Sequence, residues 1–556
     1  MRWRYLSIIF IFFVFYLALI SKLYNTQLLK RDYYSDRAVS LSRASGILEP
    51  QRGNIYFTDK NGNSIPAALN KDFNVVFSVP KEVQENVEFG DATMEWYGES
   101  LGNIFNKPSD EIIKQLSKKD DLYELLFQKA INEQVEAIRD LDLKGIYIDK
   151  QKLRFYPYGV LASHLLGYVS VTTEKEFLKY GDIQIGRYGL ESHFNQLLTG
   201  TPGEIKKDGS IDPENGKDLK LTIDRNIQSQ SEEILGKLIE SWKADGGTII
   251  VQEPKSGKIL TMASFPNFDP NNFSQSKMEN YLNPATQAIY EPGSVFKLIT
   301  MAAGIDSGRI TPETTYIDSG AVTLNGKTIK NWDLKAYGKQ TMTSVIEHSI
   351  NTGTVYAERK IGHETFYKYL INFGFDKLTG INLPSEVKGK INNLKKGKDI
   401  DFATASFGQG VAVTPIEFIS AISSIANGGV LMKPLILEGE KLEVIRRVIS
   451  EDAAKAVSEM MVSAVEKNIL ADIANYKVAG KTGTAFIPDF DKGGYTDQVI
   501  NSYVGFAPAT DPSFVILIKL EKPMGAPLAG QTVVPAFREL AQYILNYYNI
   551  SPDNLD

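Results

Sequence analysis

The chain has 556 residues, of which 43% are apolar and 23% charged, ordinary values for a protein with a packed core. This composition excludes a collagen, a disordered tail protein and a protein that crosses a membrane many times, and the net charge of −6 excludes the basic footprint of a nucleic-acid-binding protein. Cysteine is absent and the four histidines form no metal-ligand spacing, so we expect no disulfide, no thiolate nucleophile, no metal site and no nucleic-acid partner.

At the N-terminus, residues 5–21 form an uncharged apolar run between Arg4 and Lys22. As a helix, these seventeen residues extend about 25 Å, close to the roughly 30 Å hydrocarbon core of a bilayer. A cleaved signal peptide is the alternative interpretation, but no A-x-A-like cleavage site follows the run. We therefore predict an uncleaved transmembrane anchor over residues 1–22, whose flanking basic residues are too evenly balanced to give its orientation.

Residues 23–215 are predicted to form a first domain of mixed α and β structure. Asn61-Gly62 is a turn signal near its start, and residues 81–143 are charged and helix-like. A stretch at 200–221 is rich in Gly, Asp, Lys and Pro, and we place the domain boundary within it, near residue 215. Two further units are expected: a second domain at 216–550 and a short tail at 551–556.

The second domain has strand signals at both of its ends and helical signals between them. The expected elements, in chain order, are a helix at 224–243 opened by Asp224, strands at 247–252 and 258–265, a helix-rich middle, strands at 477–486, 501–508 and 513–520, and a helix at 532–549. This order predicts an α+β fold in which one sheet, assembled from both halves, is covered by helices.

Ser294 and Lys297 form the first of three short motifs that indicate chemistry. Of four S-x-x-K matches in the chain, only this one opens an apolar run, VFKLITMAAG, which predicts a buried helix. Because positions i and i+3 share a face of a helix, Lys297 should lie beside Ser294, where burial lowers the pKa of a lysine toward that of a useful base for a serine nucleophile. Taken alone, a helix-capping serine beside a solvated lysine is the commoner interpretation.

The second motif is Ser349-Ile350-Asn351, and the third is Lys481-Thr482-Gly483, followed by Thr484, on a predicted strand. The serine and asparagine of the second motif can relay a proton and hold a carbonyl group, although a serine N-cap is a simpler interpretation. Gly483 leaves room for another backbone, and an edge strand can take a peptide by β-augmentation, although an ordinary strand glycine is simpler. The three motifs are 55 and 132 residues apart, and together they are far more specific than any one alone.

This set of motifs is found in class A β-lactamases and penicillin-binding proteins. Nearly the whole chain resembles a class B penicillin-binding protein, a monofunctional peptidoglycan D,D-transpeptidase. Further blocks carry the resemblance: Arg52-Gly53-Asn54-Ile55, Arg154-Phe155-Tyr156-Pro157 with His164 and Gly167, residues 186–191, residues 405–410, and Thr414-Pro415. We expect these blocks to lie far from the chemistry, and they favour class B over β-lactamases and carboxypeptidases. Residues 492–509 resemble the division-associated, septal subclass.

The resemblance implies a serine β-lactamase/transpeptidase-like sheet covered by helices. It also implies that the first domain is an elongated, non-catalytic pedestal of the penicillin-binding-protein dimerisation type. The implied catalytic residues are Ser294 as nucleophile, Lys297 as base, Ser349 as proton relay, Asn351 and Lys481, and the implied substrate-binding residues are Thr482, Gly483 and Thr484. No cofactor or metal is implied.

The implied ligands are peptidoglycan stem peptides and β-lactams, which would bind covalently. By analogy, a membrane glycan polymerase of the SEDS family and divisome proteins would be partners. The substrate would place the catalytic domain on the extracytoplasmic side of the cytoplasmic membrane, held by residues 5–21. Three alternatives stay open: a β-lactamase or β-lactam sensor on the same fold, a D,D-carboxypeptidase, and a non-catalytic wall-synthesis scaffold.

Overall fold

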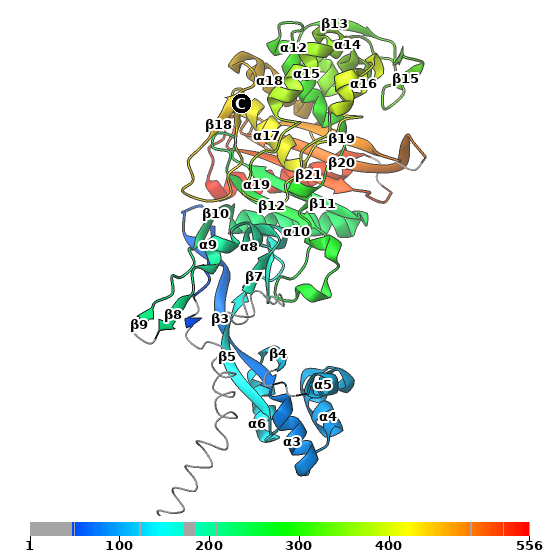
Figure 1. Ribbon diagram of the computed structural model, residues 1–556. Helices are drawn as coiled ribbons and strands as arrows, with labels where there is room; N and C mark the ends of the chain where they lie inside the picture. Colours follow the sequence, from blue (N-terminus) through cyan, green and yellow to red (C-terminus); the bar gives the residue numbers. More distant parts are fainter. Residues whose placement is uncertain are drawn as a thin grey trace, which may run out of the picture.

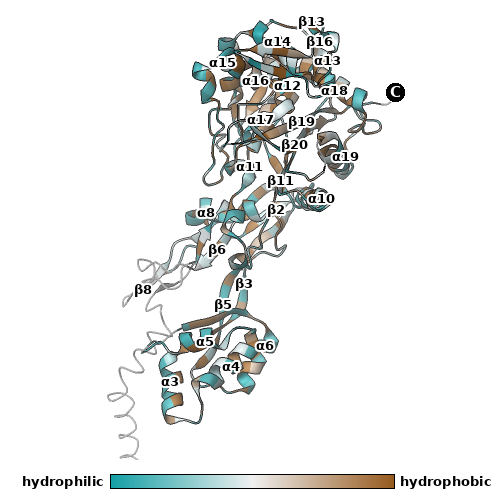
Figure 2. Ribbon diagram, turned by 90° about the vertical axis from the view of Figure 1, so that its right-hand side faces the viewer, coloured by the Kyte–Doolittle hydropathy of each residue, from teal (hydrophilic) through white to brown (hydrophobic). Residues whose placement is uncertain are grey.

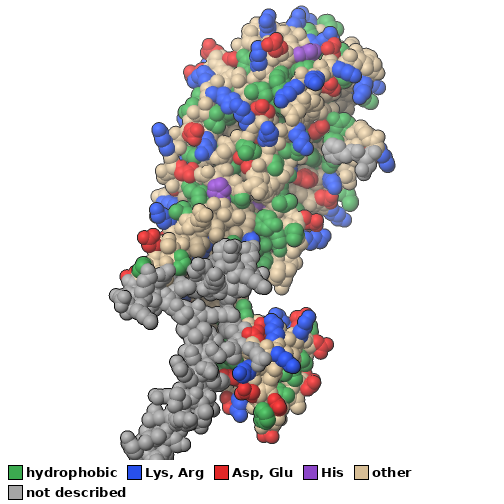
Figure 3. All heavy atoms as spheres, viewed as in Figure 1, with side chains coloured by type: hydrophobic (Ala, Val, Ile, Leu, Met, Phe, Trp, Pro, Cys, Tyr) green, Lys and Arg blue, Asp and Glu red, His purple; other side chains and the backbone are tan. Residues whose placement is uncertain are grey.

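The computed structural model shows an elongated molecule in which a small lower lobe is joined to a larger upper region by a narrow waist (Figure 1). The structure describes residues 47–48, 50–119, 121, 124–171, 184–206, 209–489, 492–525 and 528–554. The predicted anchor at 1–22 lies outside these residues, and none of the helices within them has the length and apolar character needed to span a bilayer. Acidic and basic side chains are intermingled over the lower lobe (Figure 3).

Four helices and one strand form the lower lobe. They are α3 (Pro80–Phe89), α4 (Met94–Phe105), α5 (Ser109–Leu116), β4 (Glu124–Ala130) and α6 (Asn132–Asp140). The lobe has its own apolar core, in which Val83, Tyr97 and Leu101 are fully buried. The prediction of helical structure over 81–143 is wrong at β4, because pairing with the neighbouring strand β3 outweighs local helix propensity there.

Two long strands, β3 (Ser64–Ser78) and β5 (Ile146–Phe155), form the waist and pair antiparallel along their length (Figure 1). At its upper end β3 pairs with β2 (Ile55–Thr58), which pairs in parallel with β10 (Leu219–Asp224). Since β10 follows the expected boundary near residue 215, the two domains share one sheet. The remaining pedestal elements are β1 (Ile47–Leu48), α7 (Ser163–Leu166), β6 (Tyr168–Val171), β7 (Gln184–Arg187), α8 (Gly189–His193), α9 (Asn195–Thr199), β8 (Gly203–Lys206) and β9 (Gly209–Ile211).

Three of the family-like blocks meet in a buried ionic cluster of Arg52, Arg154 and Glu191. Arg52 Nη2 donates to Glu191 Oε2 at 2.6 Å, and Arg154 Nε donates to Oε1 at 2.6 Å. Arg154 also donates to the Gly53 carbonyl at 2.8 Å. Burial alone would raise the pKa of Glu191, but the charges and hydrogen bonds of the two arginines hold it below its usual value. The cluster therefore fastens together pedestal segments that are distant in sequence.

A five-stranded antiparallel sheet forms the centre of the second domain. Its order is β12 (Ile259–Phe265), β11 (Gly246–Gln252), β21 (Phe514–Glu521), β20 (Tyr495–Ala507) and β19 (Ala479–Pro488), which places β19 at an edge. The predicted α+β sheet from both halves of the domain is confirmed. The strand expected at 501–508 begins six residues earlier, because residues 495–500 pair with the outer end of β19.

Helices cover both faces of this sheet. The helices on one face are α10 (Arg225–Trp242) and α19 (Ala529–Tyr548), and those on the other are α17 (Pro415–Ala426) and α18 (Glu451–Asn468). Strand side chains alternate between the two layers: Ile249 packs with α10 and α19, and Ile250 with the opposite core. Apolar residues are frequent in the strands and helices of these layers (Figure 2), and α17 is buried along its whole length.

The rest of the second domain is largely a helical region above the sheet (Figure 1), and its described strands form three two-stranded sheets, β13–β16, β14–β15 and β17–β18. Its helices are α11 (Pro284–Gln287), α12 (Lys297–Asp306), α13 (Met342–Glu347), α14 (Asn351–Ile361), α15 (His363–Phe373) and α16 (Asp399–Ala405). Its strands are β13 (Thr315–Asp318), β14 (Ala321–Leu324), β15 (Lys327–Lys330), β16 (Gly338–Thr341), β17 (Val430–Met432) and β18 (Val444–Arg447).

Candidate active site

A cleft of about 970 Å³ opens beside the edge strand β19, where the three sequence motifs meet. Its walls include Ser294, Ser349, Lys481, Thr482 and Thr484. Of the other three predicted site residues, Lys297 donates to Ser349, Asn351 accepts from Lys297, and Gly483 lies between Thr482 and Thr484 on β19. The fold therefore gathers all eight residues that were predicted from the sequence.

Ser294 lies in a 3₁₀ turn, Gly293–Phe296, that leads directly into α12. The helix-capping alternative is wrong, because Pro292 occupies the capping position and no side-chain cap is formed. Gly293 has a φ of +62°, and its amide donates to the Gly408 carbonyl at 3.0 Å. Val295 and Phe296 are fully buried, so the turn is fixed from below while Ser294 lines the cleft.

The Lys297 side chain is completely buried, yet no carboxylate pairs with it among the residues that the structure describes. Its Nζ donates to the Ser349 carbonyl at 2.6 Å, to Asn351 Oδ1 at 2.8 Å and to Ser349 Oγ at 3.2 Å. Burial, followed by the positive charge of Lys481, lowers the pKa of Lys297 well below its ordinary value. A neutral amine of this kind can take a proton from a serine hydroxyl.

Ser349 and Asn351 lie where α13 ends and α14 begins. Ser349 has a φ of +54°, a left-handed conformation that costs a non-glycine residue about 1–3 kcal/mol. The capping alternative for Ser349 is also wrong, since Ile350 occupies the N-cap and makes no side-chain cap. Asn351 Nδ2 donates to the Lys330 carbonyl at 2.9 Å, which orients the amide so that its oxygen faces Lys297.

Lys481 reaches the same serine hydroxyl from β19. Its side chain is 4% exposed, and its Nζ donates to Ser349 Oγ at 3.1 Å and to the Thr482 carbonyl at 3.0 Å. Burial lowers the pKa of Lys481 to about 7. Ser349 Oγ therefore lies between two lysine amines, and because a hydroxyl both accepts and donates, it can pass a proton between its neighbours.

Gly483 allows β19 to lie against the turn that carries Ser294. A Cβ at this position would lie 2.4 Å from Ser502 Oγ and 3.0 Å from the Pro292 carbonyl oxygen, so no other residue fits without displacement. Next along the strand, Thr484 Oγ1 accepts from the Ala529 amide at 3.4 Å. The outer edge of β19 pairs with no other strand in the described part of the chain, which leaves its backbone groups available to an extended peptide.

The block at 405–410 lies beside the motif cluster, and the prediction that it is far from the chemistry is wrong. The Gly408 carbonyl accepts the Gly293 amide, and a Cβ on Gly408 would lie 2.3 Å from the Gly293 oxygen. The Ser406 carbonyl accepts from Thr300 Oγ1 at 2.7 Å. The glycines of the block indicate a tight loop, but nothing in the local sequence says that this loop supports a turn more than 110 residues away.

Glu291 is a second residue near the cleft that the motifs do not include. Its Oε1 accepts from the Gly410 amide at 3.0 Å, and its Oε2 accepts from the Tyr495 hydroxyl at 2.9 Å. Burial raises the pKa of Glu291. The carboxyl group thereby joins the turn before Ser294, the loop at 408–410 and the outer end of β20.

Comparison with known proteins shows that this two-domain arrangement is shared. Residues 247–542 match the family described as penicillin binding protein transpeptidase domain, and residues 47–241 match the penicillin-binding protein dimerisation domain. The stage V sporulation protein D of Bacillus subtilis is 32% identical over 518 residues, which cover 87% of this chain and 76% of that protein. The peptidoglycan D,D-transpeptidase FtsI of Escherichia coli is 28% identical over 520 residues, 90% of this chain and 84% of that protein.

Solved structures share the fold. Penicillin binding protein 2X from Streptococcus thermophilus aligns with a TM-score of 0.71 at 23% identity, over 91% of this chain and 81% of that chain. The dimerisation-domain match runs to residue 241, past the expected boundary near 215, as the sheet shared between the two regions does. With both domains matched in this order, the chain belongs to the penicillin-binding protein transpeptidase family and has the domain composition of its class B members.

Proposed function

We propose that this protein is a membrane-anchored peptidoglycan D,D-transpeptidase that cross-links stem peptides through an acyl-enzyme on Ser294. The observation that carries the proposal is the fully buried Lys297 amine, which is hydrogen-bonded to Ser349 and Asn351 beside the cleft that Ser294 lines. Burying a lysine without a carboxylate is costly, and a purely structural role does not require it. The lowered pKa of Lys297 supports its assignment as the base.

In the first step, Lys297 takes the proton of the Ser294 hydroxyl, and Ser294 Oγ attacks the carbonyl carbon between two terminal D-alanines. The bond from Oγ to this carbon forms, and the carbon–nitrogen bond to the last D-alanine breaks. The proton passes from Lys297 through the Ser349 hydroxyl to the leaving amine, a path supported by the 3.2 Å between Lys297 Nζ and Ser349 Oγ.

Substrate binding follows from the edge position of β19. An extended stem peptide adds to this edge, with Asn351 orienting the acyl donor and Lys481, Thr482 and Thr484 binding its carboxylate end. The backbone N–H groups of Ser294 and Thr484 stabilise the oxyanion of the tetrahedral intermediate. Loss of one such donor typically costs about 2.7–4 kcal/mol of transition-state stabilisation.

In the second step, the amine of a neighbouring stem peptide attacks the acyl-enzyme carbonyl. The new amide bond forms, the bond to Ser294 Oγ breaks, and the proton lost by the amine returns to the serine. A β-lactam enters the first step as a mimic of the D-alanyl-D-alanine terminus and stays attached. Neither step needs a metal ion or a diffusible cofactor.

We place the catalytic domain on the extracytoplasmic side of the cytoplasmic membrane, because its substrate lies there, with residues 5–21 as the anchor. By analogy, its partners are a membrane glycan polymerase of the SEDS family and divisome proteins. A septal role is supported by the resemblance of residues 492–509, whereas the Bacillus relative is named for sporulation. A fluorescent fusion that labels the lateral wall evenly, without a midcell signal, would rule out the septal role.

The test of the activity compares the full-length protein with its Ser294→Ala variant. Each is incubated with a fluorescent penicillin, and its intact mass is followed for hours. A stable adduct that maps to Ser294 and is absent from the variant supports the acyl-enzyme, and an adduct lost within seconds favours a β-lactamase. Synthetic stem peptides with an amine acceptor then separate a transpeptidase, which forms the cross-linked product, from a carboxypeptidase, which forms only the shortened peptide. Absence of any adduct from the folded protein would favour a scaffold.

A further inference from the structure

The loop before α16 concentrates positive charge. Residues 388–398 contain five lysines and no acidic residue, in a chain whose net charge is −6. All five side chains are exposed, and none forms an ion pair within the described part of the chain. The lysines are Lys388, Lys390, Lys395, Lys396 and Lys398.

Hydrogen bonds fix this loop beside the turn that carries the nucleophile. Three of the lysines lie in or next to a short 3₁₀ helix, Asn392–Lys396. Asn393 Nδ2 donates to the Gly410 carbonyl at 2.8 Å, and the Gly410 amide donates to Glu291, three residues before Ser294. The positive charge is therefore held in a defined place near the cleft and is not spread over a free arm.

The β14–β15 hairpin extends the positive surface toward the cleft. Lys327 and Lys330 are exposed on β15, and at the hairpin turn Asn325 Oδ1 accepts from the Ile400 amide at 3.0 Å, which joins the hairpin to α16. The Lys330 carbonyl accepts from Asn351 Nδ2, so this lysine neighbours the motif cluster directly. We call the seven residues the lysine rim: Lys327, Lys330, Lys388, Lys390, Lys395, Lys396 and Lys398.

Several surface lysines elsewhere in the described part of the chain have acidic partners. Lys368 pairs with Glu364 at 2.7 Å, and Lys237 pairs with Glu233 at 2.8 Å. Like charges held close together repel one another, so a surface of one sign has an electrostatic cost. Beside a cleft, such a surface raises the local concentration of ligands of the opposite charge.

We propose that the lysine rim binds the carboxylate-bearing glycan strand of the polymeric substrate and guides its stem peptides into the cleft. The inference rests on the proposed function, in which the substrate is a peptide that ends in a carboxylate and belongs to a long polymer. Such a strand presents many carboxylates at once, which matches a spread of cations better than a single small anion does. A lipid surface fits less well, because α16 and β15 lie at the end of the molecule remote from β1 and the pedestal (Figure 1).

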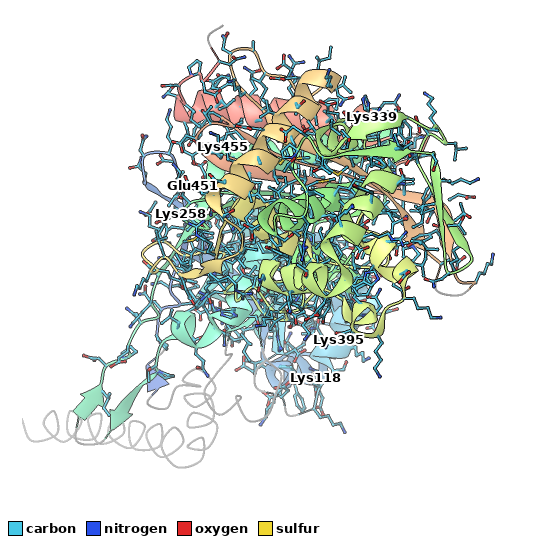
Figure 4. All side chains as sticks on the ribbon, turned by 90° about the horizontal axis from the view of Figure 1, so that it is seen from above. Lys118, Lys258, Lys339, Lys395, Glu451 and Lys455 are labelled. Atoms are coloured by element: carbon cyan, nitrogen blue, oxygen red, sulfur yellow. The ribbon has the colours of Figure 1, made fainter. Side chains whose placement is uncertain are left out.

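The test combines Lys395→Gln, Lys396→Gln and Lys398→Gln in one rim variant. A matched control combines Lys441→Gln, Lys455→Gln and Lys467→Gln, which removes the same charge from other exposed positions. Lys395 and Lys455 lie on opposite sides of the catalytic domain (Figure 4). None of the six lysines lines the cleft.

Full-length wild type and both variants are mixed with purified sacculi freed of teichoic acid, and the bound fraction is measured by co-sedimentation as salt is raised. We expect the rim variant to bind roughly fivefold less at low salt, with the difference disappearing at high salt as screening increases. The control should bind like the wild type. Sacculi whose carboxyl groups have been amidated should bind all three proteins equally, and acylation by a fluorescent penicillin should proceed at the same rate in all three.

Equal binding by the rim variant and the wild type would overturn the inference, as would an equal loss of binding in the control or a loss of acylation confined to the rim variant. Rim-dependent binding to vesicles of anionic phospholipid, but not to sacculi, would assign the surface to a membrane and overturn it as well. Failure of the proposed function is separate, since it would appear as absence of acylation in all three proteins while rim-dependent binding to sacculi persisted.

Discussion

Two places in this molecule bury a pair of cations, and their surroundings differ in charge. In the pedestal, the guanidinium groups of Arg52 and Arg154 share the carboxylate of Glu191, each at 2.6 Å. In the cleft, the amines of Lys297 and Lys481 share only a serine hydroxyl, at 3.2 and 3.1 Å. Glu191 keeps a lowered pKa despite its burial, whereas burial lowers the pKa of both lysines.

The difference between the two pairs shows how the partner of a buried cation determines the consequence of its burial. A carboxylate offsets the cost of desolvating the two guanidinium groups, which together hold distant segments of the pedestal. A neutral hydroxyl cannot offset the desolvation of two ammonium groups, and their pKa values fall instead. Arginine does not respond in this way because its pKa exceeds about 12, but lysine does. Burial of the two arginines therefore fastens segments together, and burial of the two lysines favours neutral amines, as the proposed role of Lys297 as base requires.

The largest expected effect comes from placing a permanent cation in the cleft. Lys297→Arg should slow acylation by a fluorescent penicillin about 10²–10⁴-fold, because the base is lost while the buried charge remains. Lys297→Met should slow acylation by a similar factor. It should unfold at a higher denaturant concentration than the arginine variant, because it leaves no unpaired charge. An arginine variant that retains acylation within tenfold of the wild type would contradict the assignment of Lys297 as base.

The converse change removes the carboxylate from the pedestal pair. Glu191→Gln leaves two buried guanidinium groups without a partner and should lower the free energy of unfolding by about 3–5 kcal/mol, measured by urea denaturation. The acylation rate of the folded fraction should stay unchanged, because the cluster lies outside the cleft. The control is Glu133→Gln at an exposed position, expected to change stability by less than about 0.5 kcal/mol. A loss below about 1 kcal/mol in Glu191→Gln would refute the role as fastener.

The pH dependence of stability sharpens the comparison further. In the folded protein the pKa of Lys481 is about 7, whereas an unfolded lysine has a pKa of about 10.4. Between these values the unfolded chain binds a proton that the folded chain does not, so the free energy of unfolding rises with pH. Lys481→Met lacks this pH-dependent contribution to the free energy of unfolding. Urea unfolding should therefore show that the wild type gains stability relative to the variant as the pH is raised from 7 to about 9.5. A pH-independent difference would mean that the amine keeps its ordinary pKa.

The smallest expected effect concerns Glu291, an acidic counterpart of the cleft lysines. Within the described part of the chain, its carboxyl group receives hydrogen bonds from two neutral donors, the Gly410 amide and the Tyr495 hydroxyl, and burial raises its pKa. Tyr495→Phe should cost about 0.5–1.5 kcal/mol of stability and slow acylation about two- to threefold, because one anchor of the nucleophile turn is lost. Tyr158→Phe is the control, because Tyr158 does not line the cleft, and it should behave like the wild type. Identical behaviour of the two variants would remove Tyr495 from the positioning of this turn.

Local patterns in the sequence were sufficient to predict the central sheet of the second domain and the helices α10 and α19. Strand and turn signals predicted β11 and β12, and the apolar run that follows Ser294 predicted a buried helix, which is α12. The first residues of β20, Tyr495 onward, escaped prediction because an exposed hairpin carries no apolar alternation. No local pattern shows that Ser349 adopts a left-handed conformation, which the packing of α13 against α14 imposes.

Contacts between distant segments could not be predicted either, because no local pattern in the sequence encodes them. The support of Gly293 by Gly408 and the meeting of Arg52, Arg154 and Glu191 each depend on how the whole chain folds. The motifs predicted the members of the site, but not the residues that hold the members in place.

The strand shared by the two domains has a mechanical consequence. β10 pairs with β2 of the pedestal and ends at Asp224, whose carboxylate accepts from the Asn226 and Ile227 amides and so caps α10. A pull on the pedestal is thus transmitted through the backbone hydrogen bonds between β2 and β10 to a helix under the catalytic sheet. The lengths of β3 and β5 then set the distance between the cleft and the lower lobe. Two residues added to each of these strands would move the cleft and the lobe about 7 Å further apart.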